Sequence, residues 1–257
     1  MKRSLTTALA VAAAATSAHA GGVERSTQSV AILFEQGRYA ELSYGTFSPD
    51  VSGTLGGSTG DMASSYNTYS LGYKMDVGDR MDFALIIDQP IGANVAYPAG
   101  TGYPLQGSTA KLTSSAITAL LRYQFENNVS VYGGLRYQTV KGVVSLPAIG
   151  AYTLNTNHDS EVGYVVGIAW EKPEIAARVA LTYNSAITHS LESSETGFGP
   201  GTTNAGFETE VPQSVNLEFQ SGIAKDTLLF GSIRWQEWTA FVIDPPRYAP
   251  IFSSPLV

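Results

Sequence analysis

Few residues of this sequence could support catalysis. Hydrolysis or acyl transfer needs a nucleophile with a base oriented beside it. The chain has three histidines, His19, His158 and His189, and only the last one lies next to a hydroxyl, in Thr188-His189-Ser190. Neighbouring residues of an extended stretch point to opposite faces, so this pair does not form a dyad. We therefore expect that the chain is not an enzyme.

Metal and phosphate chemistry have little support either. The chain contains no cysteine, which excludes a thiolate metal site and a disulfide framework. Asp61, Asp82 and Asp159 are scattered, and we interpret them as solvated carboxylates. The stretch GTLGGSTGD (53–61) lacks the lysine and the following helix of a phosphate-binding loop. We expect no metal and no cofactor.

The first twenty residues have the pattern of a secretory signal peptide. A basic start, Met1-Lys2-Arg3, precedes an apolar run at 5–15, and Ala18-His19-Ala20 fits an A-x-A cleavage site. The apolar run is too short to cross a bilayer as a helix. The pattern predicts a signal peptide at 1–20 and a mature chain that starts near Gly21.

Net charge and hydropathy reduce the number of protein classes that fit the sequence. The net charge is −7 and becomes more negative when Lys2 and Arg3 are removed. We expect no nucleic-acid partner, because phosphate binding needs clustered Lys and Arg. No later stretch has the 18 or so apolar residues of a membrane-spanning helix. A secreted globular domain and an outer-membrane β-barrel remain.

Alternation with period two dominates the rest of the chain. Each alternating segment approaches the roughly 9–11 residues that a tilted membrane strand needs. The segments are 39–47, 69–75, 80–88, 116–125, 129–138, 161–170, 175–184, 214–220 and 228–236.

The connections alternate between short and long. Short turns are expected at 76–79, 126–128, 171–174 and 221–226, and long loops at 48–65, 89–113, 139–159 and 185–212. Short turns on one side of a sheet and long loops on the other are the layout of an outer-membrane barrel.

The composition of the two faces of these segments also favours an outer-membrane barrel. One face is uncharged, with Tyr73, Phe125 and Trp170 towards the turns and aromatic residues such as Tyr69 and Tyr183 towards the loops. Aromatic girdles that flank an aliphatic band are typical of barrels in a bilayer. The sequence thus predicts an all-β fold, an antiparallel transmembrane β-barrel over 39–257, in the bacterial outer membrane.

The opposite face predicts an interior unlike that of an open pore. It holds the charged side chains together with apolar ones such as Ile86, Leu120 and Val165, and several glycines. A plug or an apolar ligand path explains these residues, and strand curvature is the alternative for the glycines.

The segment before the first strand fits such a plug. Within residues 21–38, Ser26 or Thr27 could cap a short helical turn with Val30, Leu33 and Phe34 on one side. The alternative is a disordered N-terminal arm.

Several motifs resemble the FadL/TodX family of outer-membrane transporters for long-chain fatty acids and other hydrophobic compounds. VPQSVNLEF followed by LLFGSIRWQEWTAF is similar to a Pro-containing strand entry and a W-x-x-W-[ST]-x-F ending, with Pro212, Trp235 and Trp238 in matching positions. DQPIGANV (88–95) is similar to the segment that follows the family's third strand. The family's Asn-Pro-Ala signature near the N-terminus is absent, so we expect a short hatch at 21–38.

The resemblance implies passive uptake of a hydrophobic small molecule by a monomer in contact with outer-membrane lipid. Ligand would pass an N-terminal hatch and leave sideways through a gap in the wall. Pro90 cannot donate a ladder hydrogen bond. We therefore expect Pro90 and Gly92 to shape an irregularity, and Val30, Leu33 and Phe34 to face the ligand path. A general porin or a structural barrel is the alternative.

The resemblance also implies a barrel of about fourteen strands, of which about nine would be present here. An unpaired edge in lipid leaves backbone groups unsatisfied. We therefore expect the sequence to be a fragment that is truncated at its C-terminus.

Overall fold

The computed structural model describes residues 23–251, so the predicted signal peptide at 1–20 lies outside the described residues. The described chain is mostly antiparallel β-structure. Its helical elements are short 3-10 turns: η3 (Ala31–Phe34), η4 (Pro173–Ile175) and η5 (Trp238–Ala240). Within 23–251, no helix is long and apolar enough to cross a membrane.

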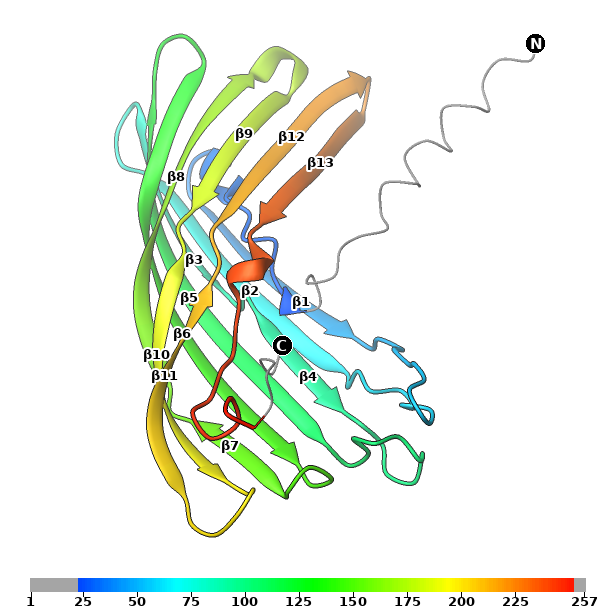
Figure 1. Cartoon of the computed structure of the whole chain (residues 1–257). Helices are drawn as coiled ribbons and strands as arrows, with labels where there is room; N and C mark the ends of the chain where they lie inside the picture. The colour runs from blue at the N-terminus through cyan, green and yellow to red at the C-terminus, as the bar shows by residue number, and fades with distance from the viewer. Residues whose placement is uncertain (1–22, 252–257) are drawn as a thin grey trace, which may run out of the picture.

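The strands form one curled sheet that resembles part of a barrel wall (Figure 1). Nine strands follow one another as hydrogen-bonded neighbours, which confirms the nine segments that alternation predicts. They are β1 (Tyr39–Phe47), β2 (Tyr66–Asp76), β3 (Met81–Asp88), β5 (Thr109–Gln124), β6 (Val129–Leu146), β8 (Asp159–Lys172), β9 (Ala177–Asn184), β12 (Ser214–Ala224) and β13 (Thr227–Gln236).

The predicted long loops are wrong in part, because four further strands lie within them. These are β4 (Gly92–Ala96), β7 (Tyr152–Thr156), β10 (Ile187–Thr196) and β11 (Thr203–Val211), and β7, β10 and β11 pair with one another or with β6. Their inner faces mix polar and apolar residues. In β10, for example, His189, Ser193 and Glu195 are as buried as Leu191. This mixture hides the alternation that marks the other strands.

Two turn boundaries also differ from prediction. The turn predicted at 221–226 is shorter, because β12 continues to Ala224 and the reversal falls on Lys225 and Asp226, the latter with φ +58°. The strand predicted from 175 begins at Ala177, after η4 and a left-handed Ala176.

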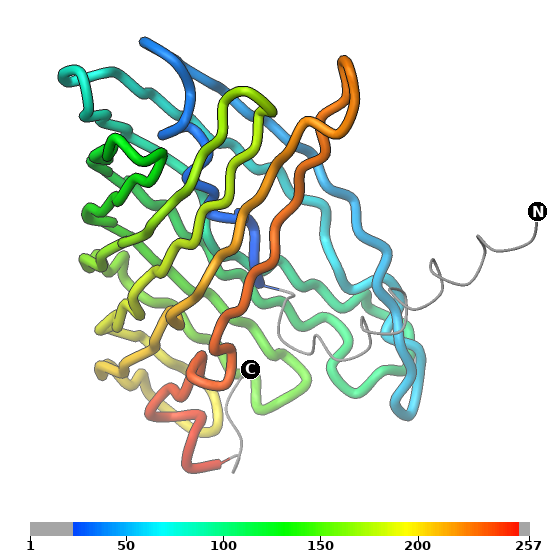
Figure 2. The backbone as a smooth tube through the Cα atoms, turned by 90° about the horizontal axis from the view of Figure 1, so that it is seen from above, coloured from blue at the N-terminus to red at the C-terminus, as the bar shows by residue number. Residues whose placement is uncertain are grey.

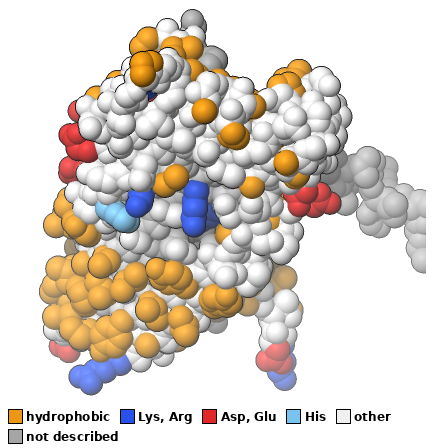
Figure 3. Space-filling model, turned by 90° about the horizontal axis from the view of Figure 1, so that it is seen from below, with side chains coloured by type: hydrophobic (Ala, Val, Ile, Leu, Met, Phe, Trp, Pro, Cys, Tyr) orange, Lys and Arg blue, Asp and Glu red, His pale blue; other side chains and the backbone are white. Residues whose placement is uncertain are grey.

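The two faces of the sheet have opposite character. The convex face exposes large apolar side chains, for example 71% of Leu42 and 61% of Leu135. Figure 3 shows hydrophobic side chains gathered in a broad patch on one side of the molecule. The concave face buries charged side chains such as Lys74, Asp82 and Arg122. The predicted separation of apolar and charged faces is therefore confirmed.

The N-terminal segment, residues 23–38, runs along the concave side of the sheet (blue in Figure 2). Val30 and Leu33 pack there against Leu120 and Val165 in one apolar cluster. The predicted helix cap is wrong: η3 begins at Ala31 and has no side-chain cap hydrogen bond. The hydroxyl of Ser26 donates instead to Asp88.

Candidate functional site

The wall is irregular where β3 passes into β4. β3 pairs with β5 as far as Asp88 with Ala116, and β4 resumes with Gly92 opposite Thr113. The residues 89–91 therefore face only 114–115 on the partner strand. One extra residue on one strand is a β-bulge, which bends the strand and interrupts its ladder.

A serine side chain repairs the ladder at this bulge. The backbone N–H of Ile91 donates to Ser114 Oγ at 2.9 Å, and Ser114 Oγ donates back to the Ile91 carbonyl at 2.6 Å. Pro90 has no N–H to offer. The irregularity expected at Pro90 and Gly92 is therefore present, although Ser114 was not anticipated.

An opening in the wall lies beside the bulge. β2 pairs with β3 up to Leu71 opposite Ile87, and its remaining residues 66–70 pair with β1 alone. Between these strands Tyr69 N donates only to the side chain of Gln89, at 3.4 Å, and backbone-to-backbone bonding resumes where Ser64 N donates to Asn94 O at 3.0 Å. A cavity of about 360 Å³ lies between these two points, lined by parts of β2, β4 and β5. We call this gap the wall opening and its cavity the wall cavity.

Arg25 of the N-terminal segment lies in the wall opening. Its backbone N–H donates to the Pro90 carbonyl at 3.0 Å and its Nε–H donates to the Gly92 carbonyl at 2.9 Å. Its guanidinium carbon lies 3.1 Å from the centre of the Tyr66 ring, within the range of a cation–π contact. A Cβ on Gly92 would lie 3.2 Å from Arg25 Cγ, so glycine leaves room for the arginine stem.

The rest of the N-terminal segment is held by inward-facing side chains. Arg122 Nη1 donates to the Leu33 carbonyl at 3.0 Å, and Asn216 Nδ2 donates to the Thr27 carbonyl at 3.0 Å. The carboxylate of Glu218 accepts hydrogen bonds from the Ser29 hydroxyl and the Val30 N–H. Apart from one isolated bridge between Glu24 and Ile91, side chains provide this attachment.

The residues that the sequence predicts for a ligand path lie in two places. Val30 and Leu33 are buried in the apolar cluster, at 1% and 0% exposure. The ring of Phe34 lies between the guanidinium groups of Arg122 and Arg178, each 4.5 Å from its centre. Pro90 and Gly92 border the wall opening. The structure thus brings Pro90 and Gly92 together with Arg25 but separates them from Phe34.

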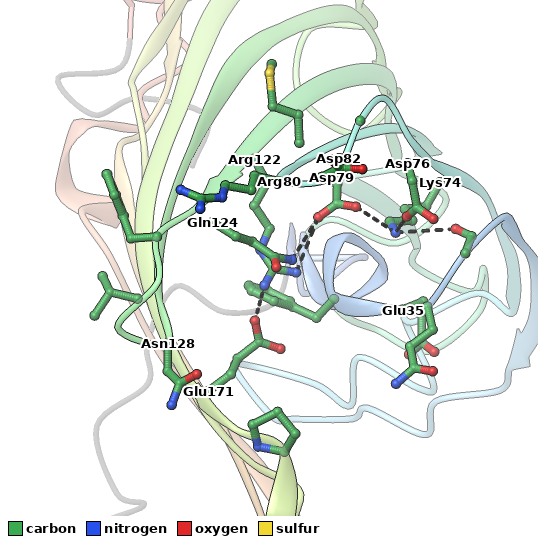
Figure 4. Close-up of a pocket in the computed structure, with 18 residues that line it drawn as sticks. Glu35, Lys74, Asp76, Asp79, Arg80, Asp82, Arg122, Gln124, Asn128 and Glu171 are labelled. Carbon is green, nitrogen blue, oxygen red and sulfur yellow. Dashed lines mark hydrogen bonds and ion pairs between the residues drawn. The ribbon is translucent and has the colours of Figure 1, made fainter.

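The turn-side end of the interior is a charged cavity of about 540 Å³ (Figure 4). Lys74 Nζ lies 2.7 Å from Asp82, and Arg122 is ion-paired with both Asp82 and Glu171. Contact with an apolar solute does not stabilise charged groups that are already ion-paired with one another. This end therefore offers a poor exit to an apolar solute.

His189 forms no catalytic pair with Ser190. Its side chain is fully buried on the loop side, with Nδ1 2.9 Å from Asp159 Oδ2, whereas Ser190 is exposed on the other face. Burial lowers the pKa of His189 below its ordinary value, against the opposing influence of Asp159. The described residues contain no group of three or more His, Cys, Asp or Glu that could hold a metal.

Sequence reasoning missed Arg25, which is the central side chain of the wall opening. A signal for it exists, because Arg25 is the single basic residue between Gly21 and Gly37. A lone cation in a segment expected to lie inside a barrel must find a partner there. The partners of its guanidinium, the Gly92 carbonyl and the Tyr66 ring, come from segments whose proximity the sequence does not reveal.

No family model and no curated protein matches the chain. Among solved structures, the chain is similar to a FadL homologue from Pseudomonas aeruginosa, with 15% identity and a TM-score of 0.56 over 78% of this chain and 59% of that one. It is also similar to TodX, described as a monoaromatic hydrocarbon channel, in a mutant lacking S2 and S3. That match has 11% identity and a TM-score of 0.61, over 86% of this chain and 68% of the other. Neither description names an enzyme. The chain therefore has the fold of the FadL and TodX proteins, as its sequence motifs predict.

Proposed function

We propose that the chain forms the wall and the hatch of an outer-membrane channel for passive uptake of hydrophobic compounds, such as long-chain fatty acids or aromatic hydrocarbons. The observation that carries this proposal is the wall opening, which is spanned by a residue of the N-terminal segment instead of by strand pairing. The matched region spans about three fifths of the FadL homologue, so uptake is proposed for the whole protein.

The surroundings of the wall opening favour a sideways exit. Next to it, the convex face has a hollow of about 410 Å³ lined mainly by apolar groups, among them Leu42, Leu71, Leu85 and Ile87. The hydrocarbon tail of a ligand that moves from the wall cavity into this hollow keeps its methylene groups out of water. Burial of each methylene group contributes about 0.8 kcal/mol. The charged turn-side cavity offers no such gain.

The N-terminal segment has the attachment expected of a hatch. Its contacts with the wall are mostly side-chain hydrogen bonds, which can break without disturbing a strand ladder. Gln28 adds backbone strain, since it is a buried non-glycine residue with φ +51°. Movement of this segment would connect the interior of the sheet with the wall opening.

Cross-linking tests the proposal directly. The chain has no cysteine, so Ser29→Cys with Glu218→Cys introduces a unique pair at a hydrogen-bonded contact. Cells that lack other uptake channels are treated with a short bis-methanethiosulfonate linker, and uptake of labelled palmitate and hexadecane is measured. We expect the linker to stop uptake and a reductant to restore it. Each single-cysteine variant, treated in the same way, is the control.

Uptake that continues unchanged in the fully cross-linked pair would contradict the proposal. A general porin, the alternative, predicts high ion conductance in planar bilayers. A channel that is occupied by its N-terminal segment predicts low conductance, which rises when residues 23–35 are deleted.

A further inference from the structure

Arg25 takes the place of a strand at the edge of β4. Asn94 and Ala96 use this edge to bond with the chain that precedes β2, through Asn94 O and Ala96 N. At Pro90 and Gly92 the same edge accepts its hydrogen bonds from Arg25. The residue thus closes the wall where β2 has moved away.

Arg25 also separates the wall cavity from the interior. Two inner cavities of about 400 Å³ each, one beside β1–β3 and one beside β12–β13, share Arg25 with the wall cavity. The first shares Gln89 with it as well, and the second shares Tyr66. Arg25 therefore borders the boundary between the wall cavity and each of the inner cavities.

The wall cavity is positively charged. Its lining contains Arg25 and Lys111, and within residues 23–251 it contains no Asp or Glu. The inner cavities differ, because acidic residues such as Glu41 and Glu218 line them. A cavity with two cations and no carboxylate favours an anionic group over a neutral or cationic one.

The guanidinium of Arg25 has N–H donors that no described residue accepts. Among the described residues only its Nε makes a side-chain hydrogen bond, to Gly92 O. The terminal nitrogens are left to a ligand, and their planar fork matches a carboxylate, which can accept two parallel N–H bonds. A carboxylate that binds there competes with the Gly92 carbonyl and the Tyr66 ring for the same group.

We propose that Arg25 gates the wall opening and selects amphipathic ligands with a carboxylate headgroup, with Lys111 as a second cation in the wall cavity. This inference rests on the proposed uptake function. The headgroup draws the guanidinium away from β4, and the apolar tail follows through the opening. A neutral hydrocarbon has no group that can do so.

The experiment compares initial uptake rates of palmitate and hexadecane, which have equal chain length, in cells that produce the whole protein to which this chain belongs. The variants are Arg25→Gln, Arg25→Lys and Lys111→Gln. Lys172→Gln, at an exposed turn-side position outside these cavities, is the matched loss of one positive charge. Surface labelling and heat-modifiability on gels verify that each variant is folded in the membrane.

We expect Arg25→Gln to lower palmitate uptake about tenfold, the loss of one charge-assisted hydrogen bond, and to leave hexadecane uptake unchanged or raised. Arg25→Lys should lose less, Lys111→Gln should lower palmitate uptake more weakly, and Lys172→Gln should change neither. If the whole protein without substitutions takes up both compounds and Arg25→Gln lowers both equally or neither, the inference is overturned and the proposed function stands. If the whole protein without substitutions takes up neither compound above background, the proposed function itself fails.

Discussion

The β5–β6 pair and the β2–β4 region are two parts of one wall with different means of closure. β5 pairs with β6 without interruption from Thr109 opposite Ser145 to Gln124 opposite Ser130. Between β2 and β4 the ladder is broken and Arg25 supplies hydrogen bonds in its place, while Ser114 bridges the adjoining bulge between β4 and β5. A ladder is released only by unfolding a strand, whereas a side chain is released by a rotamer change. The broken region can therefore open while the rest of the wall stays folded.

The largest expected effect comes from the buried ion pairs of Arg122, which join β5 to β3 and β8 within the wall. Arg122 is 4% exposed, and its removal leaves Asp82 and Glu171 without their shared partner. Arg122→Ala should lower the free energy of unfolding by about 3–5 kcal/mol, measured by urea titration of tryptophan fluorescence in micelles. Arg80→Ala is the control, because the Arg80–Glu126 pair is exposed and should be worth less than about 1 kcal/mol. Equal losses would contradict this assignment.

Gly134→Ala tests the unbroken part of the wall. A Cβ at Gly134 would lie 1.8 Å from the carbonyl oxygen of Ala119, which is backbone of the neighbouring strand and cannot turn aside. We expect the free energy of unfolding to fall by about 3 kcal/mol, in the same urea titration. An unchanged unfolding midpoint would show that β5 and β6 are farther apart than described here.

The same substitution at Gly92 should behave differently. A Cβ there meets the Arg25 side chain at 3.2 Å and the Leu112 carbonyl at 3.3 Å, so the flexible arginine can move. Gly92→Ala should cost less than about 1 kcal/mol of stability but should raise hexadecane uptake, since Arg25 is displaced. A loss of stability as large as that of Gly134→Ala would remove the contrast between the two regions.

The smallest expected effect is a pH dependence of the free energy of unfolding. It arises from His189, which lies on the loop side, away from both regions. Burial lowers the pKa of His189 in the folded chain, so the unfolded chain binds the proton first. Stability should therefore be complete above the ordinary histidine pKa of about 6.5 and should be lost as pH falls below it. In urea titrations at several pH values, His189→Gln should flatten this part of the profile. If His189→Gln leaves the pH dependence of stability unchanged, another titratable group causes that dependence.

The sequence predicts the wall better than the site. The nine principal strands are visible because every second residue of each, such as Leu42 and Leu135, belongs to a face that carries no charge. β10 is hidden because its buried positions include His189 and Glu195. Pro90 marks the bulge through its missing N–H. The position of Arg25 depends on how the N-terminal segment lies across strands far away in the chain, and no local pattern encodes that.

The bulge at 89–91 changes which residue numbers face the interior of the sheet. Before it, the even-numbered Ala84 and Asp88 are buried on the inner face, and after it the odd-numbered Ile91 and Ala93 lie in the interior. Deletion of a single residue there would turn every side chain of β4 to the opposite face. In a library of variants, the half-buried Gln89 should accept many substitutions, whereas one-residue deletions within 89–91 should be rejected. Sequence length, more than residue identity, is what selection has to preserve beside the opening.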